Sequence, residues 1–425
     1  MTVGTRGAIG TTVAIGLEAV RRGLRAPSGI RTETARLPKN GSWVPRVTRD
    51  RPLLRDALGL APLDGIVASG WDRSALSLSA AARKHGVVDT ALLAALDDVL
   101  PEAAPYDAVE RVGDGFSRHG RPLGSAREAC DLLRRDIAAF RTTAELDEVV
   151  VVNLMPTAPP VPPDPALETL PRFEAALEAS SPAITAGMLY FYAACREGCS
   201  HINFTPNLVE VPALRELAAR CGVPFAGRDG KTGQTFLKTV LASAFRSRDL
   251  HVRGWFSTNI LGNSDGLALS APDALSTKVS SKLEALEQTL GYPVTSPSGE
   301  PAHLVSIHYY PPRGDAKEAW DNIDLCGFLD APMQVKVNFL CQDSALAAPL
   351  VIDLVRFAAH ARGRGEAGVL DYLSGYFKTP LTAGQDHTPE HDFFAQDAAL
   401  ALYVEAAAAA PSPGPLMAEK GPAAR

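Results

Sequence analysis

Along the N-terminal half, short apolar runs alternate with helical patterns, as is typical of a parallel sheet covered by helices. Glu148–Asn153 contains an uninterrupted β-branched run, which predicts a central strand covered on both faces. Gly65–Asp72 reads as a second buried strand that ends at a loop. Helical patterns such as Ala126–Arg141 separate these segments. The alternation predicts an α/β fold with a doubly wound sheet.

The region from Phe225 to Cys341 alternates helices and strands differently. It ends in the strand-like segments Leu304–Tyr310 and Met333–Leu340, which suggest an open sheet. Helices are expected at Ala345–Arg362 and Ala395–Ala410, and the proline-rich segment Pro156–Pro165 is expected to be a loop. Residues from about Pro411 onward have the composition of a disordered tail.

The N-terminus carries glycines three residues apart, at Gly4, Gly7 and Gly10, followed by a helical run at Val13–Arg22. Such a turn suits a phosphate, because no Cβ blocks close approach and the helix start offers free N–H groups. The spacing differs from the standard GxGxxG, so a flexible glycine-rich terminus is the alternative. Only Met1–Val3 precede the turn, so either the first strand is very short or the real start lies upstream.

Composition narrows the class of partner. The 425 residues suggest two or three domains, and 46% hydrophobic with 21% charged residues exclude disorder as the main state. A net charge of −6 is unfavourable for binding nucleic acid or an anionic membrane. No apolar run is long enough to span a bilayer, and Glu18 with Arg21-Arg22 argues against a signal peptide. Six sparse cysteines suggest reduced thiols in the cytosol.

The densest polar segment runs from Gly227 to Lys238. Thr232-Gly233-Gln234-Thr235 opens a predicted helix that continues to Phe245, and hydroxyl, amide and backbone N–H groups at a helix start can hold a phosphate. Lys231 and Lys238 add positive charge. The alternative is an ordinary helix cap with solvated lysines.

Further polar clusters follow along the chain. Asn259–Gly266 has a turn composition that can also hold sugar hydroxyls. Lys278 and Lys282 lie four apart and would share a helix face, although a solvated surface is the simpler explanation. Lys378 is flanked by aromatic residues and is expected to be partly desolvated, with a lowered pKa. His387–His391 matches the zinc pattern H-x-x-E-H, but Pro389 would break the helix that this pattern requires, so no metal site is predicted.

Taken together, these segments resemble myo-inositol-phosphate synthases from the glycine turn to about Leu381. The most specific stretches are Gly230–Ala242, Asn259–Ser270, Gly314–Asp321 and Asp343–Leu354. The resemblance implies an NAD-binding, Rossmann-like doubly wound domain formed by residues 1–224 and 342–410. It also implies an inserted α/β catalytic and oligomerisation domain at 225–341, a disordered tail at 411–425, and a homotetramer.

The resemblance implies a redox-neutral reaction with NAD as cofactor. C5 of glucose 6-phosphate is oxidised, an enolate forms at C6, C6 attacks the C1 aldehyde, and reduction gives 1D-myo-inositol 3-phosphate. The implied catalytic residues are Lys278, Lys317, Lys378, Asp229, Asp265 and Asp315. The implied substrate-binding residues are Thr232, Gly233, Gln234, Thr235, Lys282, Lys238 and Asn263. The implied cofactor-binding residues are Gly7, Gly10, Thr11, Thr12, Asp72, Asn153, Asn259 and Asp343.

Several alternatives stay open at this level. Phe204 stands where a small residue is usual in the family, so the substrate could differ. A variant that makes a five-membered cyclitol phosphate from fructose 6-phosphate needs the same contacts. An ordinary NAD dehydrogenase and a non-catalytic NAD-sensing scaffold are the rivals from other classes. The expected partner is a small sugar phosphate, with no nucleic acid and no membrane, in the cytoplasm. An assisting cation of unknown identity is left open.

Overall fold

The computed structural model describes residues 1–102, 104–263, 266, 286–296, 298–384 and 387–410. Asp265, Lys278, Lys282 and the predicted tail at 411–425 therefore lie outside the described residues. The helices are α1 (Ala8–Arg21), α2 (Arg31–Thr34), α3 (Leu54–Leu58), α4 (Leu78–His85), α5 (Thr90–Leu96), α6 (Ala126–Thr143), α7 (Leu170–Glu178), α8 (Ala186–Arg196), α9 (Pro212–Arg220), α10 (Gln234–Ser247), α13 (Asp343–Gly363) and α14 (Phe393–Ala409).

The strands form three sheets. A seven-stranded sheet has the order β14 (Gly368–Val369), β9 (Pro224–Gly227), β8 (Ser200–Asn203), β7 (Val150–Asn153), β1 (Thr2–Val3), β2 (Gly70–Asp72) and β3 (Tyr106–Asp107). A four-stranded sheet has the order β11 (His303–Tyr309), β10 (His251–Leu261), β12 (Ala316–Cys326) and β13 (Pro332–Gln342). A small third sheet consists of β4 (Val109–Val112), β5 (Gly115–Arg118) and β6 (Arg121–Pro122).

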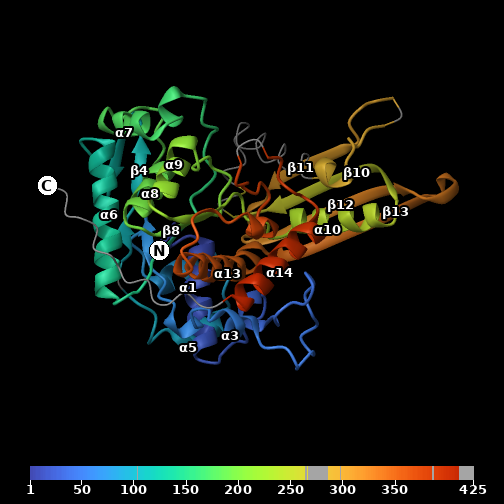
Figure 1. Ribbon diagram of the computed structural model, residues 1–425, viewed down its shortest axis with the longest axis horizontal. Coiled ribbons are helices and arrows are strands. Elements are labelled where there is room, and N and C mark those ends of the chain that lie inside the picture. The colour runs from blue at the N-terminus through green and yellow to red at the C-terminus, as the bar shows by residue number, and fades with distance from the viewer. Residues whose placement is uncertain (103, 264–265, 267–285, 297, 385–386, 411–425) are drawn as a thin grey trace.

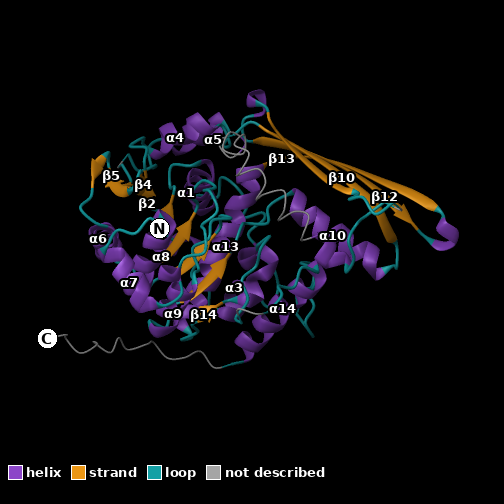
Figure 2. Cartoon of the chain, turned by 90° about the horizontal axis from the view of Figure 1, so that it is seen from above, coloured by secondary structure: helices purple, strands orange, loops and turns teal. Residues whose placement is uncertain are grey.

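Every strand pair in the seven-stranded sheet is parallel, which confirms the predicted doubly wound architecture. The apolar run in β7 shows why both faces are covered. Val151 packs into one hydrophobic cluster, and Val150 and Val152 pack into another, because successive side chains of a strand point to opposite faces. Helices α6 and α8 cover the first face, and α1 and α13 cover the second (Figures 1 and 2).

The first two strands are shorter than the sequence pattern suggests. β1 is Thr2–Val3, and it pairs with both β2 and β7. The strand predicted over 65–72 is reduced to Gly70–Asp72, and Val67 is exposed. A strand forms only where a neighbour offers backbone to pair with, and β1 offers two residues. A Cβ at Gly70 would lie 1.9 Å from the Thr2 carbonyl oxygen, so this close pairing needs glycine.

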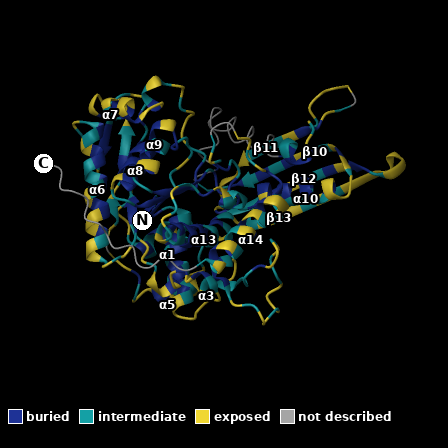
Figure 3. Ribbon diagram, in the orientation of Figure 1, coloured by how far each residue is buried: buried dark blue, intermediate teal, exposed yellow. Residues whose placement is uncertain are grey.

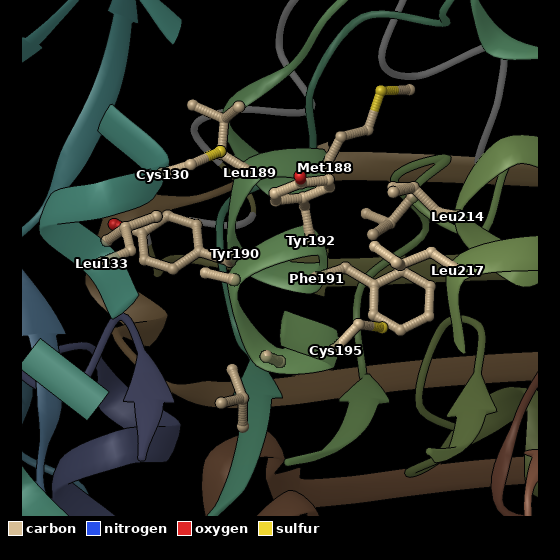
Figure 4. Packing of buried hydrophobic residues seen from close by; sticks show 14 of the residues in the cluster. Cys130, Leu133, Met188, Leu189, Tyr190, Phe191, Tyr192, Cys195, Leu214 and Leu217 are labelled. Carbon is tan, nitrogen blue, oxygen red and sulfur yellow. The ribbon is translucent and has the colours of Figure 1, made fainter. Parts of the chain in front are cut away.

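The interior of the seven-stranded half is formed by α8, whose residues are buried on all sides except at Arg196 (Figure 3). Figure 4 shows Tyr190, Phe191 and Tyr192 of α8 among side chains from α6 and α9. Among the described helices, α13 is the one long and apolar enough to span a membrane, but most of it is buried against the sheet. All six cysteines are free.

The four-stranded sheet extends to one side of the molecule (Figure 1), with α10 packed on one face through Ala242 and Phe245 against Trp255 and Ile323. β10 and β11 are parallel, and the other pairs are antiparallel. The predicted boundary between residues 224 and 225 divides β9. Since β9 pairs with β8 and β14, the chain leaves the first sheet only after Gly227. It returns where β13 runs directly into α13.

One buried carboxylate joins three segments on the α13 face. Asp353 is fully buried and accepts hydrogen bonds from the backbone N–H groups of Arg31 and Thr32. It also accepts from the Thr32 hydroxyl at 2.6 Å and the Tyr376 hydroxyl at 3.4 Å. α2, α13 and the segment that leads to Lys378 are thereby held together.

We predict that Asp353→Ala lowers the free energy of unfolding by about 2–4 kcal/mol, because it leaves buried donors without an acceptor. Asp98→Ala, at an exposed position, should change it by less than about 0.5 kcal/mol. Denaturant titration of both variants measures the effect. Equal stabilities would contradict the role given to Asp353.

Candidate functional site

A cavity of about 560 Å³ lies at the carboxyl ends of β1, β2, β7 and β8. In the strand order, β2 and β7 flank β1 on opposite sides, so this is the point where the direction of winding reverses, the usual place for a ligand in such sheets. The predicted site residues that line the cavity are Gly7, Gly10, Asp72, Asp229, Thr232, Asn263, Lys317, Asp343 and Lys378. The cavity therefore brings together residues that lie far apart in the sequence.

The glycine turn forms one end of the cavity. Gly4 has φ +95°, and Gly7 caps α1 without any side-chain hydrogen bond. A Cβ on Gly10 would lie 2.7 Å from the Gly4 carbonyl oxygen, so Gly10 permits the helix to pack on the turn. The N–H groups at the start of α1 point along the helix axis and attract anions, so a dinucleotide pyrophosphate fits this end.

Thr11 and Thr12, in contrast, do not line the cavity. The Thr11 hydroxyl donates to the carbonyls of Gly7 and Ala8, and the Thr12 hydroxyl donates to Ala8. Both side chains are thus bonded to the backbone of their own helix. Their role as cofactor contacts remains a prediction.

Asp72 joins the glycine turn to the end of β2. Its carboxylate accepts from the backbone N–H of Arg6 at 2.7 Å and of Ser74 at 2.9 Å. Arg6 lines the same end of the cavity; burial lowers the pKa of its guanidinium, and the charge of Asp72 opposes that shift. Asn153, at the end of β7, is fully buried outside the cavity lining and donates to the Asn203 side chain at 3.3 Å.

The other end of the cavity holds two lysines beside carboxylates. Lys378 donates from Nζ to Asp229 Oδ1 at 2.7 Å, and these side chains are 12% and 7% exposed. The backbone N–H of Lys378 also donates to the Asp229 carbonyl, and Asp229 adopts φ +59°. A Cβ on Gly230 would lie 2.1 Å from the Phe204 ring, so glycine is required where this loop crosses the aromatic side chain.

Lys317 is the second lysine. Its Nζ lies 3.4 Å from Asp343 Oδ1, and the same oxygen accepts from the Thr232 hydroxyl at 3.0 Å. Lys317 is the second residue of β12 and Asp343 begins α13, so this group sits where the two sheets meet. The lysine and Thr232 converge on one carboxylate from different elements.

Asp315 supports the same junction. Its carboxylate accepts from the hydroxyl and the N–H of Ser344, and from Asn263 Nδ2 at 3.3 Å. Burial raises the pKa of Asp315, and the bonds from Ser344 oppose the shift. The sequence analysis missed Ser344, although its position directly after Asp343 in the family-like stretch was a usable signal.

Gln234 and Asn259 lie deeper, between α10 and the four-stranded sheet. Gln234 donates to Asp321 Oδ2 at 2.8 Å and accepts from Asn259 Nδ2 at 2.5 Å. Gly233 caps α10 without a side-chain bond. Thr235 Oγ1 and Asn259 Oδ1 are buried atoms that have no hydrogen-bond partner within the described part of the chain. A helix start with such unpaired atoms fits an anionic ligand.

Two lysines that we expected to face the sugar phosphate lie elsewhere. Lys238 Nζ lies 2.7 Å from His303 Nε2 under the four-stranded sheet, and Lys231 donates to Gln396 of α14 at 2.7 Å. Burial lowers the pKa of each to about 7. Neither lines the cavity, because each projects into protein interior on another side of its element. The segment around His387 is not helical, and α14 begins only at Phe393.

Comparison with known proteins places this geometry in a family. A family profile described as myo-inositol-1-phosphate synthase, of an NAD-binding type, matches residues 1–404. The chain is 38% identical over 406 residues to inositol-3-phosphate synthase 1 of Bacteroides thetaiotaomicron, covering 93% of this chain and 92% of that protein. It is 30% identical to the inositol-3-phosphate synthase of Drosophila melanogaster, covering 84% of this chain and 66% of that protein.

Solved structures of proteins with related names have the same fold as this chain. The crystal structure of inositol-3-phosphate synthase from Caenorhabditis elegans superimposes with a TM-score of 0.84 at 25% identity, covering 97% of this chain and 86% of that one. A myo-inositol-1-phosphate synthase-related protein from Thermotoga maritima shares the fold, with a TM-score of 0.70 at 22% identity, over 95% of this chain and 97% of that one. The profile match over almost the entire described chain, together with these relatives, shows that this protein belongs to the myo-inositol-1-phosphate synthase family.

Proposed function

We propose that this protein is an inositol-3-phosphate synthase, an isomerase that converts D-glucose 6-phosphate to 1D-myo-inositol 3-phosphate. One observation carries the proposal: a single cavity has an anion-binding glycine turn at one end and two lysine–carboxylate pairs at the other. Relatives that match most of this chain bear the name of that enzyme.

NAD⁺, when bound, supplies the acceptor for the substrate hydride and later the donor that returns it. The glycine turn and Asp72 would hold it, because the first offers backbone N–H groups and the second a carboxylate at the end of β2. The cyclitol is then at the oxidation level of the starting sugar, so no external oxidant is consumed.

The two lysines would stabilise negative charge on substrate oxygens. Enolate formation and ring closure both place charge on oxygen, and fixed cations lower the energy of such states most in an enclosed site. Lys378 is fixed by Asp229 and Lys317 by Asp343, so little reorganisation is needed when the charge develops. Asp315, whose pKa is raised by burial, holds the Ser344 turn beside them.

The start of α10 would receive the substrate phosphate. Thr232 lines the cavity, Gly233 leaves the helix start uncapped, and the Thr235 hydroxyl is buried with no bond to any other described residue. A phosphate accepts from hydroxyl and backbone N–H groups in this arrangement. Asn259 lies in β10 and Asn263 follows the end of that strand, and both would contact sugar hydroxyls or the cofactor.

The names of the relatives do not support the alternative of a five-membered ring made from fructose 6-phosphate. Product analysis by NMR after incubation with NAD⁺ and each hexose phosphate would identify the ring directly. An assisting cation is a further proposal, and the carboxylates of Asp315 and Asp343 are the groups that would attract it.

We further propose that the enzyme is a cytoplasmic homotetramer. Its free cysteines suit a reducing compartment. The outer face of the four-stranded sheet carries exposed apolar side chains at Phe256, Leu304, Trp320 and Leu340, each between 48% and 61% exposed. An apolar face of this kind usually packs against a partner, and a second copy of this chain is the partner we propose.

With glucose 6-phosphate and NAD⁺, we predict that cyclitol phosphate accumulates while free NADH does not. The hydride taken from the substrate returns to it, so the cofactor is recycled. Absorbance of the reduced nicotinamide, followed beside phosphorus NMR of the product, tests this. Steady NADH release in proportion to product would instead identify a dehydrogenase.

Lys317→Ala should lower turnover by about 100-fold or more, because one fixed cation is removed from the site of developing charge. NAD affinity should be retained, since the glycine turn lies at the other end of the cavity. Lys39→Ala, at an exposed position, is the control and should match the wild type. Turnover of Lys317→Ala within about tenfold of the wild type would contradict the assigned role.

For the assembly, Trp320→Glu should reduce the mass measured by light scattering, because a carboxylate in an apolar contact is costly to desolvate. Val47→Glu is the matched control, since Val47 is an exposed apolar residue on the other half of the molecule. An unchanged mass for Trp320→Glu would count against this face as the contact between copies.

A further inference from the structure

We propose that the side chain of Asn207 holds the proline loop, residues 156–165, against the cofactor end of the cavity and thereby slows the release of NADH during the reaction cycle. The inference rests on the proposed function, because only a reaction that returns its hydride needs the reduced cofactor to stay bound. Asn207 is a positioning residue in this proposal. It acts through the loop and not on the substrate.

The proline loop has little backbone with which to anchor itself. Six of its ten residues are proline, at positions 156, 159, 160, 162, 163 and 165. Proline has no backbone N–H, so only Thr157, Ala158, Val161 and Asp164 can donate. Within the described residues, the amide of Ala158 is the one of these four that has a hydrogen-bond partner. That partner is Asn207.

Asn207 binds the loop at two points. Its Oδ1 accepts from the Ala158 N–H at 2.8 Å, and its Nδ2 donates to the Pro156 carbonyl at 2.9 Å. One side-chain amide thus replaces the backbone pairing that the prolines prevent. The stiff chain between prolines then transmits this fixed position along the loop.

Asn207 is itself held by buried neighbours. Its backbone N–H donates to Thr205 Oγ1 at 3.3 Å, and its carbonyl accepts from Asn203 Nδ2 at 2.9 Å. The Thr205 hydroxyl donates to Asn203 Oδ1 at 2.8 Å, and Asn153 donates to the same oxygen. Asn153 and Asn203 are fully buried at the ends of β7 and β8. Through Asn207, the position of the proline loop is therefore fixed relative to the ends of β7 and β8.

The held segment lies directly on the cavity. Met155, Pro156 and Thr157 line it, and Thr205 and Pro206 line it beside them. The glycine turn lines the same end of the cavity, so a bound dinucleotide would lie between the turn and the proline loop. Opening the loop would widen the route by which the cofactor leaves.

Retention has a chemical reason in this reaction. The first step would move a hydride from the substrate carbon to NAD⁺ and release the hydroxyl proton, and the last step would return the hydride and a proton to the ketone. If NADH dissociates between these steps, the hydride leaves with it and the ketone intermediate cannot be reduced. A chain that catalyses the complete cycle needs slow NADH release relative to ring closure. The Asn207 contacts supply a structural basis for it.

The experiment measures NADH dissociation from the full-length protein by stopped-flow fluorescence, with excess NAD⁺ as the displacing ligand and no substrate present. Asn207→Ala should release NADH about tenfold faster than the wild type, because both contacts to the loop are lost. Asn207→Gln keeps both amide functions on a longer side chain and should fall between the two. Pro101→Ala, an exposed proline in a different loop, is the control and should match the wild type.

Two further readouts separate this role from a merely structural one. During turnover with glucose 6-phosphate, Asn207→Ala should release free NADH that the wild type does not. Hydrogen exchange at the Ala158 amide should be faster in that variant, with unchanged exchange in β7 and β8. NADH release from Asn207→Ala within twofold of the wild type would overturn the proposal. Failure of the wild type to form cyclitol phosphate would overturn the proposed function alone, because the dissociation rates need no substrate.

Discussion

The site depends on the pairing of Lys317 and Lys378 with carboxylates that are held in place. A lysine taken out of water loses hydration, and its charged form becomes less favourable unless an anion lies beside it. The chain shows both situations. Lys231 donates to the neutral amide of Gln396, and burial lowers its pKa to about 7. Lys378 instead donates to the carboxylate of Asp229. The cations proposed to act on the substrate are those that have an anionic partner.

Such pairing explains why two sheets are needed. Asp343 lies where β13 of the four-stranded sheet becomes α13 of the seven-stranded half, and Lys317 and Thr232 reach it from other elements. Asp353, about three turns further along α13, holds the segment that leads to Lys378 through the Tyr376 hydroxyl. One helix therefore sets the distance between the cofactor half and the substrate half. Its burial, not contact with lipid, accounts for its apolar composition.

The cofactor end of the cavity differs from the lysine end because it is formed mainly by backbone groups and not by charged side chains. Glycines shape the turn at the start of α1, and prolines remove the N–H groups of the loop that faces it. In both places the backbone needs help from a side chain elsewhere: Asp72 binds the turn, and Asn207 binds the loop. Recognition by the turn and retention by the loop, both at this end, would suit a cofactor that is used twice in one cycle.

The sequence alone determined the doubly wound sheet, the main helices and the family, because apolar periodicity and short ordered stretches are local properties. It also predicted Lys317 and Lys378 as site residues, and both line the cavity. It did not determine which lysines share a cavity: the tertiary structure turned Lys231 and Lys238 into the interior. The spacing of residues along the chain determines which face of a helix or strand each side chain occupies. Which other element packs against that face depends on the tertiary structure. Packing likewise decided that the chain leaves the first sheet after β9 and that Asn207 binds the proline loop.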